Sequence, residues 1–342
     1  MMSINPRNRL ATFKTVAGLT IGLLIFLYSF STQAAISRPV IEEGKPTEVQ
    51  VVGAILDVDK IDSTEQNFTL NFYSAYRWQD PRLAHEGPGN IIRDLSEVWN
   101  PRLTILNSQK HWSNTRDEVE ITPAGEATFR LHHFSSFSQP LDLHDFPHDR
   151  HIFKIVVAAA GYSSDEVVLV PHPHIDSFIA EKLSVADWKI SNMQGKSREV
   201  TLANHLKLSG FVFSFEGKRL VHHHVVKTLI PLTLIVMMSW VVFWIDPELA
   251  ANRLGLAVTT VLTLIAYHIA MSRQIPKIPY LTDMDKFLLL TTLLVFIALI
   301  EVVISTSLFN TDRQALANKV DRTSRWLFPA LFSCSLGYSF YL

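Results

Sequence analysis

The chain has 342 residues, 48% of them hydrophobic, and a formal net charge of −1. The mean hydropathy of +0.17 is too high for an ordinary soluble enzyme, and the near-zero charge gives no argument for nucleic acid as a partner. The length allows about two domains. Because Cys334 is the single cysteine, no intrachain disulfide can form.

The N-terminus has the pattern of a signal peptide. A basic region that includes Arg7, Arg9 and Lys14 precedes an apolar run over 16–30, and the small residues of "STQAA" end it. The alternative is a first transmembrane helix, but the run is short and ends like a cleavage site. We therefore expect residues 1–35 to be removed and the mature chain to be exported.

Residues 36–222 are predicted to form an exported, immunoglobulin-like β-sandwich. Many short alternating segments are separated by turn-forming residues, and long helical patterns are absent. In "FTLNFYSAYRW" every second residue from Phe68 to Trp78 shares one face. The region contains no Gly-rich phosphate loop, GxSxG or CxxC, and we expect no cofactor.

Four apolar segments follow in residues 223–342, and each approaches the roughly 20 residues that span a bilayer. Basic residues between the third and fourth segments indicate a cytoplasmic connection, which agrees with an exported β domain. Those residues are Arg313, Lys319, Arg322 and Arg325. The predicted helices cover 225–245, 252–273, 285–309 and 324–342.

The second apolar segment mixes small and hydroxylated residues into one stripe at helical spacing. Two interpretations are open: ordinary helix packing through small residues, or a water-filled path with an apolar constriction, formed by several copies around an axis. The stripe consists of Gly255, Thr259, Leu262, Ala266, Ile269 and Arg273.

The stretch "LDLHDFPHDRHIF", 141–153, places three histidines and three aspartates around one Phe-Pro step. By itself it is consistent with a metal site, a pair of acid/base dyads or a polar turn. The segment after the second apolar run contains Pro276 and Pro279, and we expect these prolines to stiffen it.

Together these segments resemble a bacterial pentameric ligand-gated ion channel of the Cys-loop receptor superfamily. The order and spacing of the motifs make the resemblance specific over nearly the whole mature chain. The motifs are "WNPRLTILN" (99–107), "FPHD" (146–149), "IPLTLIVMMSWVVFW" (230–244), "IPKIPYLT" (275–282), "IEV" (300–302) and "SRWLFP" (324–329).

The resemblance implies a homopentamer in the bacterial inner membrane, with the β domain on the periplasmic or extracellular side and inorganic ions as the permeant species. The six stripe residues become pore-lining positions, with Leu262 and Ile269 as an apolar gate. At the two positions where members of the family have cysteines, this sequence has Gln139 and Phe153. The resemblance also implies a gating interface of Asp62, Phe146, Pro147, Asp149, Arg219, Pro276 and Pro279.

A ligand site between subunits is implied, near Arg102, Tyr162 and His205 of one subunit and near Tyr76 and Arg77 of its neighbour. An aromatic cage for a quaternary amine is not evident, since such a cage needs clustered aromatics. An anionic or neutral small molecule fits the arginines, and solvated surface arginines are the alternative interpretation.

Protons are the second candidate agonist, because histidine titrates near neutral pH. The candidates lie at the expected domain junction: His144, His148, His222, His223 and His224.

Ion selectivity and two other classes of function stay open. Ala251 and Asn252 fill positions where bacterial cation channels often carry glutamate, whereas Asp246 and Glu248 lie slightly earlier. We expect cation conduction. The alternatives are a membrane sensor that does not conduct and a membrane-anchored zinc enzyme using "HDFPHDRH", although no HExxH motif occurs and we expect no bound metal.

Overall fold

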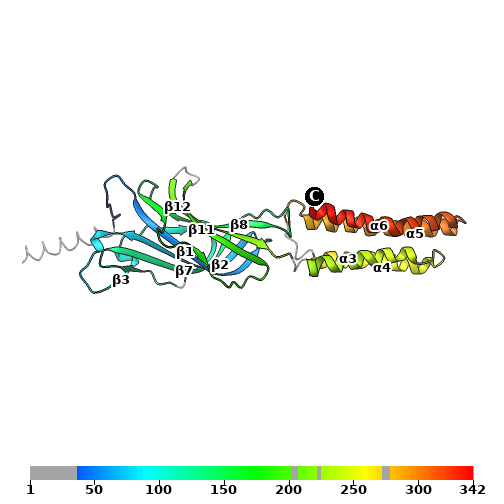
Figure 1. Ribbon diagram of the computed structural model, residues 1–342, viewed down its shortest axis with the longest axis horizontal. Coiled ribbons are helices and arrows are strands. Elements are labelled where there is room, and N and C mark those ends of the chain that lie inside the picture. Colours follow the sequence, from blue (N-terminus) through cyan, green and yellow to red (C-terminus); the bar gives the residue numbers. More distant parts are fainter. Residues whose placement is uncertain (1–36, 114, 202–206, 222–224, 272–277, 342) are drawn as a thin grey trace, which may run out of the picture.

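The computed structural model describes residues 37–113, 115–201, 207–221, 225–271 and 278–341. It shows two bodies placed end to end, a β-sandwich followed by a bundle of helices (Figure 1). The chain returns through the bundle, so that its C-terminal end lies beside the β domain. The predicted signal peptide, 1–35, lies outside the described residues.

Within the described residues the strands form two sheets. The first has eight strands in the order β10-β1-β2-β7-β6-β3, with β5 on β7 and β9 on β1, and the second has the order β11-β12-β8-β4. The strands are β1 (Thr47–Asp62), β2 (Asn67–Gln79), β3 (Ile91–Asp94), β4 (Leu103–Ile105), β5 (Ser108–Ser113), β6 (Glu118–Ile121), β7 (Glu126–Ser138), β8 (Arg150–Ala159), β9 (Val167–Pro171), β10 (Phe178–Ile179), β11 (Trp188–Thr201) and β12 (Lys207–Arg219).

The two sheets pack through alternating apolar side chains, as the sequence predicts. In β2 every second residue from Phe68 to Trp78 is buried. The Phe72 ring lies 5.1 Å from that of Phe213 across the sandwich, and Phe68 meets Phe215 at 5.7 Å. The β-sandwich prediction is therefore confirmed, with an aromatic core between the layers.

The helical body begins with a π-helical turn, Val225–Leu229, which continues as α3 (Ile230–Val241) and a 3-10 turn, Val242–Trp244. The change of helix type falls at Pro231, which cannot donate a backbone hydrogen bond. Among the described residues, three helices are long and apolar enough to span a membrane: Val226–Trp244, α4 (Ala250–Met271) and α5 (Asp283–Asn310).

The fourth helix, α6 (Gln314–Tyr341), begins ten residues earlier than predicted. The expected loop is reduced to Thr311–Arg313, so Lys319, Arg322 and Arg325 are helical. The prediction was wrong because hydropathy marks only the apolar part of a helix, whereas lysine and arginine are also good helix formers.

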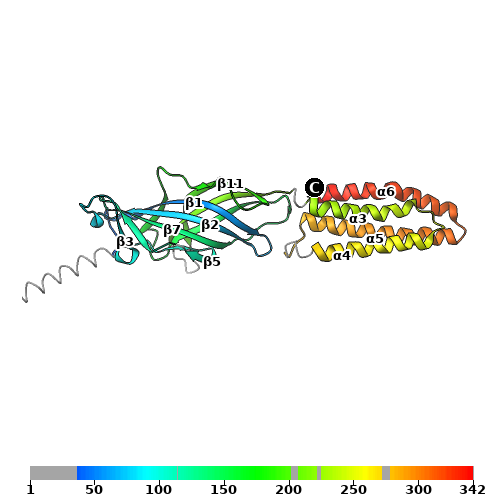
Figure 2. The same ribbon diagram turned by 90° about the horizontal axis from the view of Figure 1, so that it is seen from below.

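The helices form a bundle in which α5 packs against both α4 and α6. Figure 2 shows α4 and α6 at opposite edges of the bundle. At the start of α5, the Thr282 hydroxyl accepts the Asp285 N–H (3.1 Å) and the Asp285 carboxylate accepts the Thr282 N–H (3.0 Å). This capping box fixes where α5 begins, next to the β domain.

Candidate functional site

The predicted stripe on α4 faces away from the rest of the chain. Leu262 is 61% exposed and Ile269 is 64% exposed, and Gly255, Thr259 and Ala266 are exposed as well. The opposite face is buried and includes Arg253, Ala257, Thr260, Val261, Leu264 and Met271. Arg273, the outermost residue of the stripe, lies outside the described residues. The stripe is thus a surface that a single subunit leaves uncovered.

A buried ion pair joins the loop before β8 to the end of β12 at the domain junction. Arg219, the last residue of β12, donates from Nε to Asp149 Oδ1 (2.7 Å) and from Nη2 to Asp149 Oδ2 (3.0 Å). Its guanidinium also lies over the rings of Trp188 (4.2 Å) and Phe146 (4.9 Å). The structure therefore brings the predicted acid and cation together as a bidentate pair between aromatic faces.

Two neighbours complete this pair. His151 Nε2 lies 2.8 Å from Asp149 Oδ2, and Arg219 Nη2 donates to Ser63 Oγ (2.7 Å). Burial by itself would raise the pKa of Asp149, but the hydrogen bonds from His151 and Arg219 outweigh it and lower the pKa to about 2. Asp149 is therefore a stable carboxylate.

Asp62, the expected third member, does not join this cluster. Its carboxylate accepts the backbone N–H groups of Thr64 and Glu65 (both 3.0 Å) and pairs with Lys60 (2.5 Å). Asp62 caps the turn after β1, and the adjacent Ser63 reaches Arg219 instead. Sequence reasoning missed Ser63 and Trp188, because each comes from a segment of the chain far from Asp149, and it noted His151 only as one of the three histidines of the stretch 141–153.

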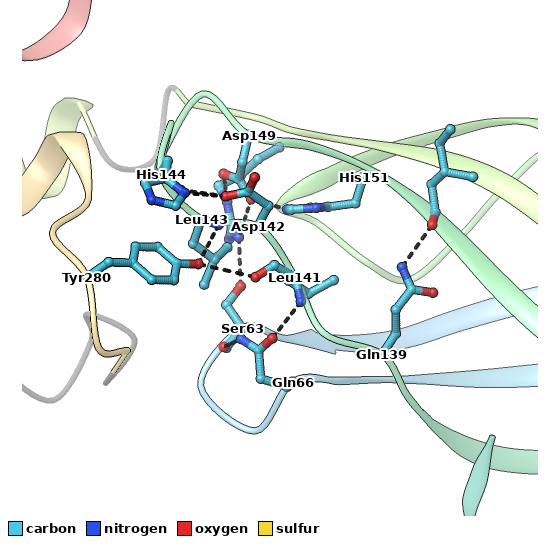
Figure 3. Close-up of polar contacts among 12 residues, drawn as sticks. Ser63, Gln66, Gln139, Leu141, Asp142, Leu143, His144, Asp149, His151 and Tyr280 are labelled. Atoms are coloured by element: carbon cyan, nitrogen blue, oxygen red, sulfur yellow. Dashed lines mark hydrogen bonds and ion pairs between the residues drawn. The ribbon is translucent and has the colours of Figure 1, made fainter. Parts of the chain in front are cut away.

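The loop of residues 141–149, here called the signature loop, contacts the membrane domain directly (Figure 3). The Leu143 N–H donates to the Tyr280 hydroxyl (3.0 Å), which in turn donates to the Leu141 carbonyl (3.4 Å). At the start of α5, the N–H groups of Asp283 and Met284 donate to the His144 and Phe146 carbonyls (2.9 and 3.2 Å).

Other predicted interface residues fall around this contact. The Phe146–Pro147 peptide bond is cis, and both side chains are buried. Pro279 is exposed beside Tyr280, and Pro276 lies outside the described residues. Tyr280, which the sequence did not single out, is the side chain through which the linker meets the loop.

The histidines of the signature loop point to different partners. His144 stacks on Tyr280, with ring centroids 4.0 Å apart, and its Nδ1 lies 2.6 Å from Asp142 Oδ1. His148 is exposed, with its ring 5.7 Å from that of Phe340 on α6. Within the part of the chain that the structure describes, no group of three His, Cys, Asp or Glu could hold a metal ion. His222, His223 and His224 lie outside the described residues.

Gln139 occupies one of the two family cysteine slots and holds the loop without a disulfide. Its side-chain amide donates to the Ile152 carbonyl (2.8 Å) and accepts the Lys154 N–H (2.9 Å), so that it meets β8 on both sides of Phe153. Two neutral hydrogen bonds thus join the two ends of the loop where the family carries a bridge.

The ligand candidates on β2 are divided between two faces. Tyr76 is 0% exposed in the sandwich core, so the expectation of a ligand contact there is wrong. The error has a plain cause, since Tyr76 belongs to the alternating core face. Arg77 lies on the outer face, with its Nε 3.4 Å from Glu126, and lines a cavity of ≈ 240 Å³ together with Tyr73 and Arg130.

The other ligand candidates lie elsewhere. Arg102 lines a separate cavity of ≈ 430 Å³ between the sheets, and the Tyr162 hydroxyl accepts from Trp99 Nε1 (2.8 Å). Gly161, next to Tyr162, packs against the Arg102 side chain. Arg102 and Tyr162 are therefore close, whereas Arg77 lines a different cavity of the same chain. His205 lies outside the described residues.

Comparisons with known proteins agree with this architecture. Residues 28–217 match the family model of the neurotransmitter-gated ion-channel ligand binding domain, and residues 228–315 match that of the neurotransmitter-gated ion-channel transmembrane region. The chain is 30% identical over 270 residues to the gamma-aminobutyric acid receptor subunit beta-4 of Gallus gallus, covering 75% of this chain and 54% of the relative.

A second relative is the gamma-aminobutyric acid receptor subunit rho-3 of Homo sapiens. It is 26% identical over 292 residues, which cover 82% of this chain and 62% of the relative. The chain spans less than two thirds of the length of either relative. Because the ligand-binding model alone matches more than half of the chain, the protein is a multi-pass membrane member of the neurotransmitter-gated ion-channel family, whose members are channels and not enzymes.

Proposed function

We propose that the chain is the subunit of a homopentameric, ligand-gated ion channel. The observation that carries the proposal is the exposed stripe of α4, where hydroxyl and small side chains alternate with large apolar ones on a surface that the subunit itself does not cover. Five such helices around an axis would use this face to line a water-filled path. Helix packing through small residues explains the stripe less well, because Leu262 and Ile269 are large.

Leu262 and Ile269 are the proposed gate. Two rings of branched apolar side chains narrow the path and can close it by dewetting, while Thr259 and Gly255 leave the inner part wider and more polar. The Thr259 hydroxyl donates to the Gly255 carbonyl (2.7 Å), so its oxygen lone pairs remain available towards the pore.

The junction is the proposed coupling path between ligand and gate. Asp149 and Arg219 fix the signature loop to the sandwich, and Tyr280 and the first turn of α5 fix the same loop to the membrane domain. A movement of the β-sandwich would therefore reach Tyr280 and the outer end of α5 through one loop. Histidine 144, stacked on Tyr280, is part of that contact.

The ligand is proposed to be a small molecule with a carboxylate group, bound at the outer-face cavity that Arg77 and Arg130 line. Burial and the nearby Arg77 lower the pKa of His172 in this cavity, so the imidazole stays neutral and the arginines carry the positive charge. Both arginines also face carboxylates, Glu126 and Glu120, which suits a zwitterion. The relatives named as gamma-aminobutyric acid receptors make that zwitterion a sensible first probe.

External pH is proposed as a modulator of gating. The hydrogen bond from His144 lowers the pKa of Asp142, so this carboxylate is ionised and a protonated His144 would form an ion pair with it. Protonation of His144 would thereby change the net charge of the His144–Asp142 pair, which contacts Tyr280 through the His144 ring.

Cations are the proposed permeant ions. Arg253, near the inner end of α4, is 0% exposed and its guanidinium pairs with Asp321 inside the bundle, so its charge does not face the pore. The exposed carboxylates of Asp246 and Glu248 precede α4 on the inner side and would attract cations.

A bacterial inner membrane is the proposed location, with the β domain outside the cell. The supporting features are the connection between α5 and α6, reduced to Thr311–Arg313, and the use of Gln139 in place of a cysteine.

The test is electrical recording from the purified full chain in planar bilayers, with gamma-aminobutyric acid and with external pH steps. Leu262→Thr is the companion variant, because a hydroxyl in the apolar ring should hydrate the constriction and produce current without any ligand. A reversal potential in a salt gradient gives the sign of the permeant ion. If the assembled Leu262→Thr variant conducts nothing, the channel proposal is wrong.

A further inference from the structure

The inner part of α6 holds both sides of the turn that joins α3 to α4. Arg325 Nε donates to the Phe243 carbonyl (2.9 Å) just before the turn, and its guanidinium lies 5.6 Å from the Trp244 ring centroid. Asp321 Oδ1 accepts from Arg253 Nη2 (2.8 Å) just after the turn. Because Asp321 and Arg325 are four residues apart, they share one face of α6.

The contact between Asp321 and Arg253 crosses the interior of the bundle. Arg253 is 0% exposed and Asp321 is 2% exposed, although their helices lie at opposite edges of the bundle. Arg253 Nη1 also donates to Ser305 Oγ on α5 (3.3 Å). Charged side chains in a membrane domain are costly unless they are paired, so those that occur tend to be functional.

A second carboxyl group faces the same pair. Glu301 of α5 is buried and interacts electrostatically with both Arg253 and Asp321. Glu301 also interacts with the side chains of Ser324 and Asp321, whereas Arg253 Nε has no hydrogen-bond partner among the described residues. Of the direct hydrogen bonds that hold Arg253, the bond to Asp321 is the shortest.

The segment between the two contacts carries the acidic groups of the inner mouth. It contains Asp246 and Glu248, both exposed, and is followed by Ala251 and Asn252 at the start of α4, which are exposed as well. Asp246 Oδ1 accepts the Glu248 N–H (3.0 Å), so the two acidic residues form one compact turn. Where this turn sits relative to α4 decides where the carboxylates lie relative to the pore axis.

We propose that α6 positions the inner mouth of the pore, and that Asp321 and Arg325 are positioning residues for ion conduction. The inference rests on the proposed function, since it assumes that α4 lines a pore. Asp321 keeps the Arg253 cation inside the bundle, and Arg325 keeps the end of the preceding helical segment against α6. Together they place the carboxylates of Asp246 and Glu248 near the ion path and remove a cation from it.

The experiment uses the full chain in planar bilayers, with every variant made in the Leu262→Thr background so that no agonist is needed. Asp321→Asn and Arg325→Gln are compared with matched controls on exposed parts of the same region, Asp312→Asn and Arg322→Gln. The readouts are single-channel conductance and the reversal potential in a potassium chloride gradient. Asp321→Glu, which keeps the charge, serves as the conservative variant.

Asp321→Asn and Arg325→Gln should lower cation conductance by about two- to threefold and shift the reversal potential towards zero, because a local potential of about one kT is lost. The controls and Asp321→Glu should behave like the background. Unchanged conductance and reversal potential in both test variants would overturn the inference. If Asp321→Asn fails to assemble, Arg325→Gln decides alone. Absence of current in the background itself would instead overturn the proposed function.

Discussion

Two buried arginine–aspartate pairs lie in the two halves of the molecule, and their surroundings differ. At the domain junction, Arg219 and Asp149 form two hydrogen bonds, and Ser63, His151 and two aromatic rings complete the cluster. In the membrane domain, Arg253 and Asp321 share a single bond of 2.8 Å. The contact from Arg253 to Ser305 is 3.3 Å long, and Arg253 Nε has no hydrogen-bond partner among the described residues.

The comparison indicates that the two pairs have different mechanical roles. A buried ion pair is held in one geometry when all its polar groups have hydrogen-bond partners. When some of these groups lack partners, the pair can adopt other geometries of similar energy. The junction pair therefore suits a rigid connection that transmits movement of the sandwich. The membrane pair suits a contact that can be rearranged when the pore changes state. Each prediction below tests one side of this contrast.

The largest effect is expected from Asp149→Asn. It leaves the Arg219 charge buried without its counter-charge, which should reduce stability by about 3 kcal/mol or more. The measurement is the fraction of detergent-solubilised protein that stays assembled after heating. Asp145→Asn, an exposed carboxylate of the same loop, is the control and should melt like wild type. Equal melting of both variants would contradict the idea of a rigid junction.

The second effect is a pH dependence of stability that belongs to Asp149. The pKa of this carboxyl is lowered from 3.8 to about 2 in the folded protein. Because the folded pKa is the lower one, the stabilisation is complete above the unfolded pKa and is lost as the pH falls from about 4 to about 2. A difference of nearly two pH units corresponds to about 2 kcal/mol.

Denaturant midpoints measured over that pH range would reveal this contribution. The difference in denaturant midpoint between wild type and Asp149→Asn should become smaller towards the acidic end of the range, because the wild-type carboxylate becomes protonated there. A difference in midpoint that stays constant from about pH 5 to about pH 2 would mean that the ionised form of Asp149 is not what stabilises the junction.

A third effect compares the serine that supports each arginine. Ser63→Ala removes a 2.7 Å bond to Arg219, and Ser305→Ala removes a 3.3 Å bond to Arg253. Bonds to charged groups contribute about 1.5 kcal/mol or more when short, so Ser63→Ala should be clearly destabilising. Ser305→Ala should cost about 0.5 kcal/mol or less, since long bonds are weak. Thermal melting of the two variants, measured in parallel, compares their losses of stability. A larger loss in Ser305→Ala than in Ser63→Ala would mean that the membrane pair is the more firmly held of the two.

The difference between the two pairs also explains what the sequence could reveal. Asp149 and Arg219 were expected to pair because the family resemblance places both at the junction, and the structure confirms the contact. Periodicity likewise predicted the buried face of β2 and placed the stripe of α4 on one side of its helix. These features depend on local spacing or on a recognisable motif, and both spacing and motifs can be read directly from the sequence.

Features that depend on long-range packing were missed. Ser63 rather than Asp62 reaches Arg219, because the turn after β1 directs one side chain outward and its neighbour inward. Arg253 was not singled out, although a charge beside an apolar run, with an aspartate on another inner helix end, is a usable signal of intramembrane pairing. Tyr76 shows the opposite error, where a motif position outweighed the periodicity that correctly placed it in the core.

A fourth effect, smaller than that of Ser63→Ala, concerns Gln139, which joins the loop ends with neutral hydrogen bonds rather than charges. Gln139→Ala removes two bonds to the β8 backbone in a partly exposed site, so the expected loss of stability is about 1 kcal/mol. Gln109→Ala, at an exposed position on β5, is the control. Because an amide does not titrate, the loss should be the same at about pH 7 and about pH 4. A loss that disappeared in acid would show that carboxylates, and not the amide, hold the signature loop, and the junction would then depend on charge throughout.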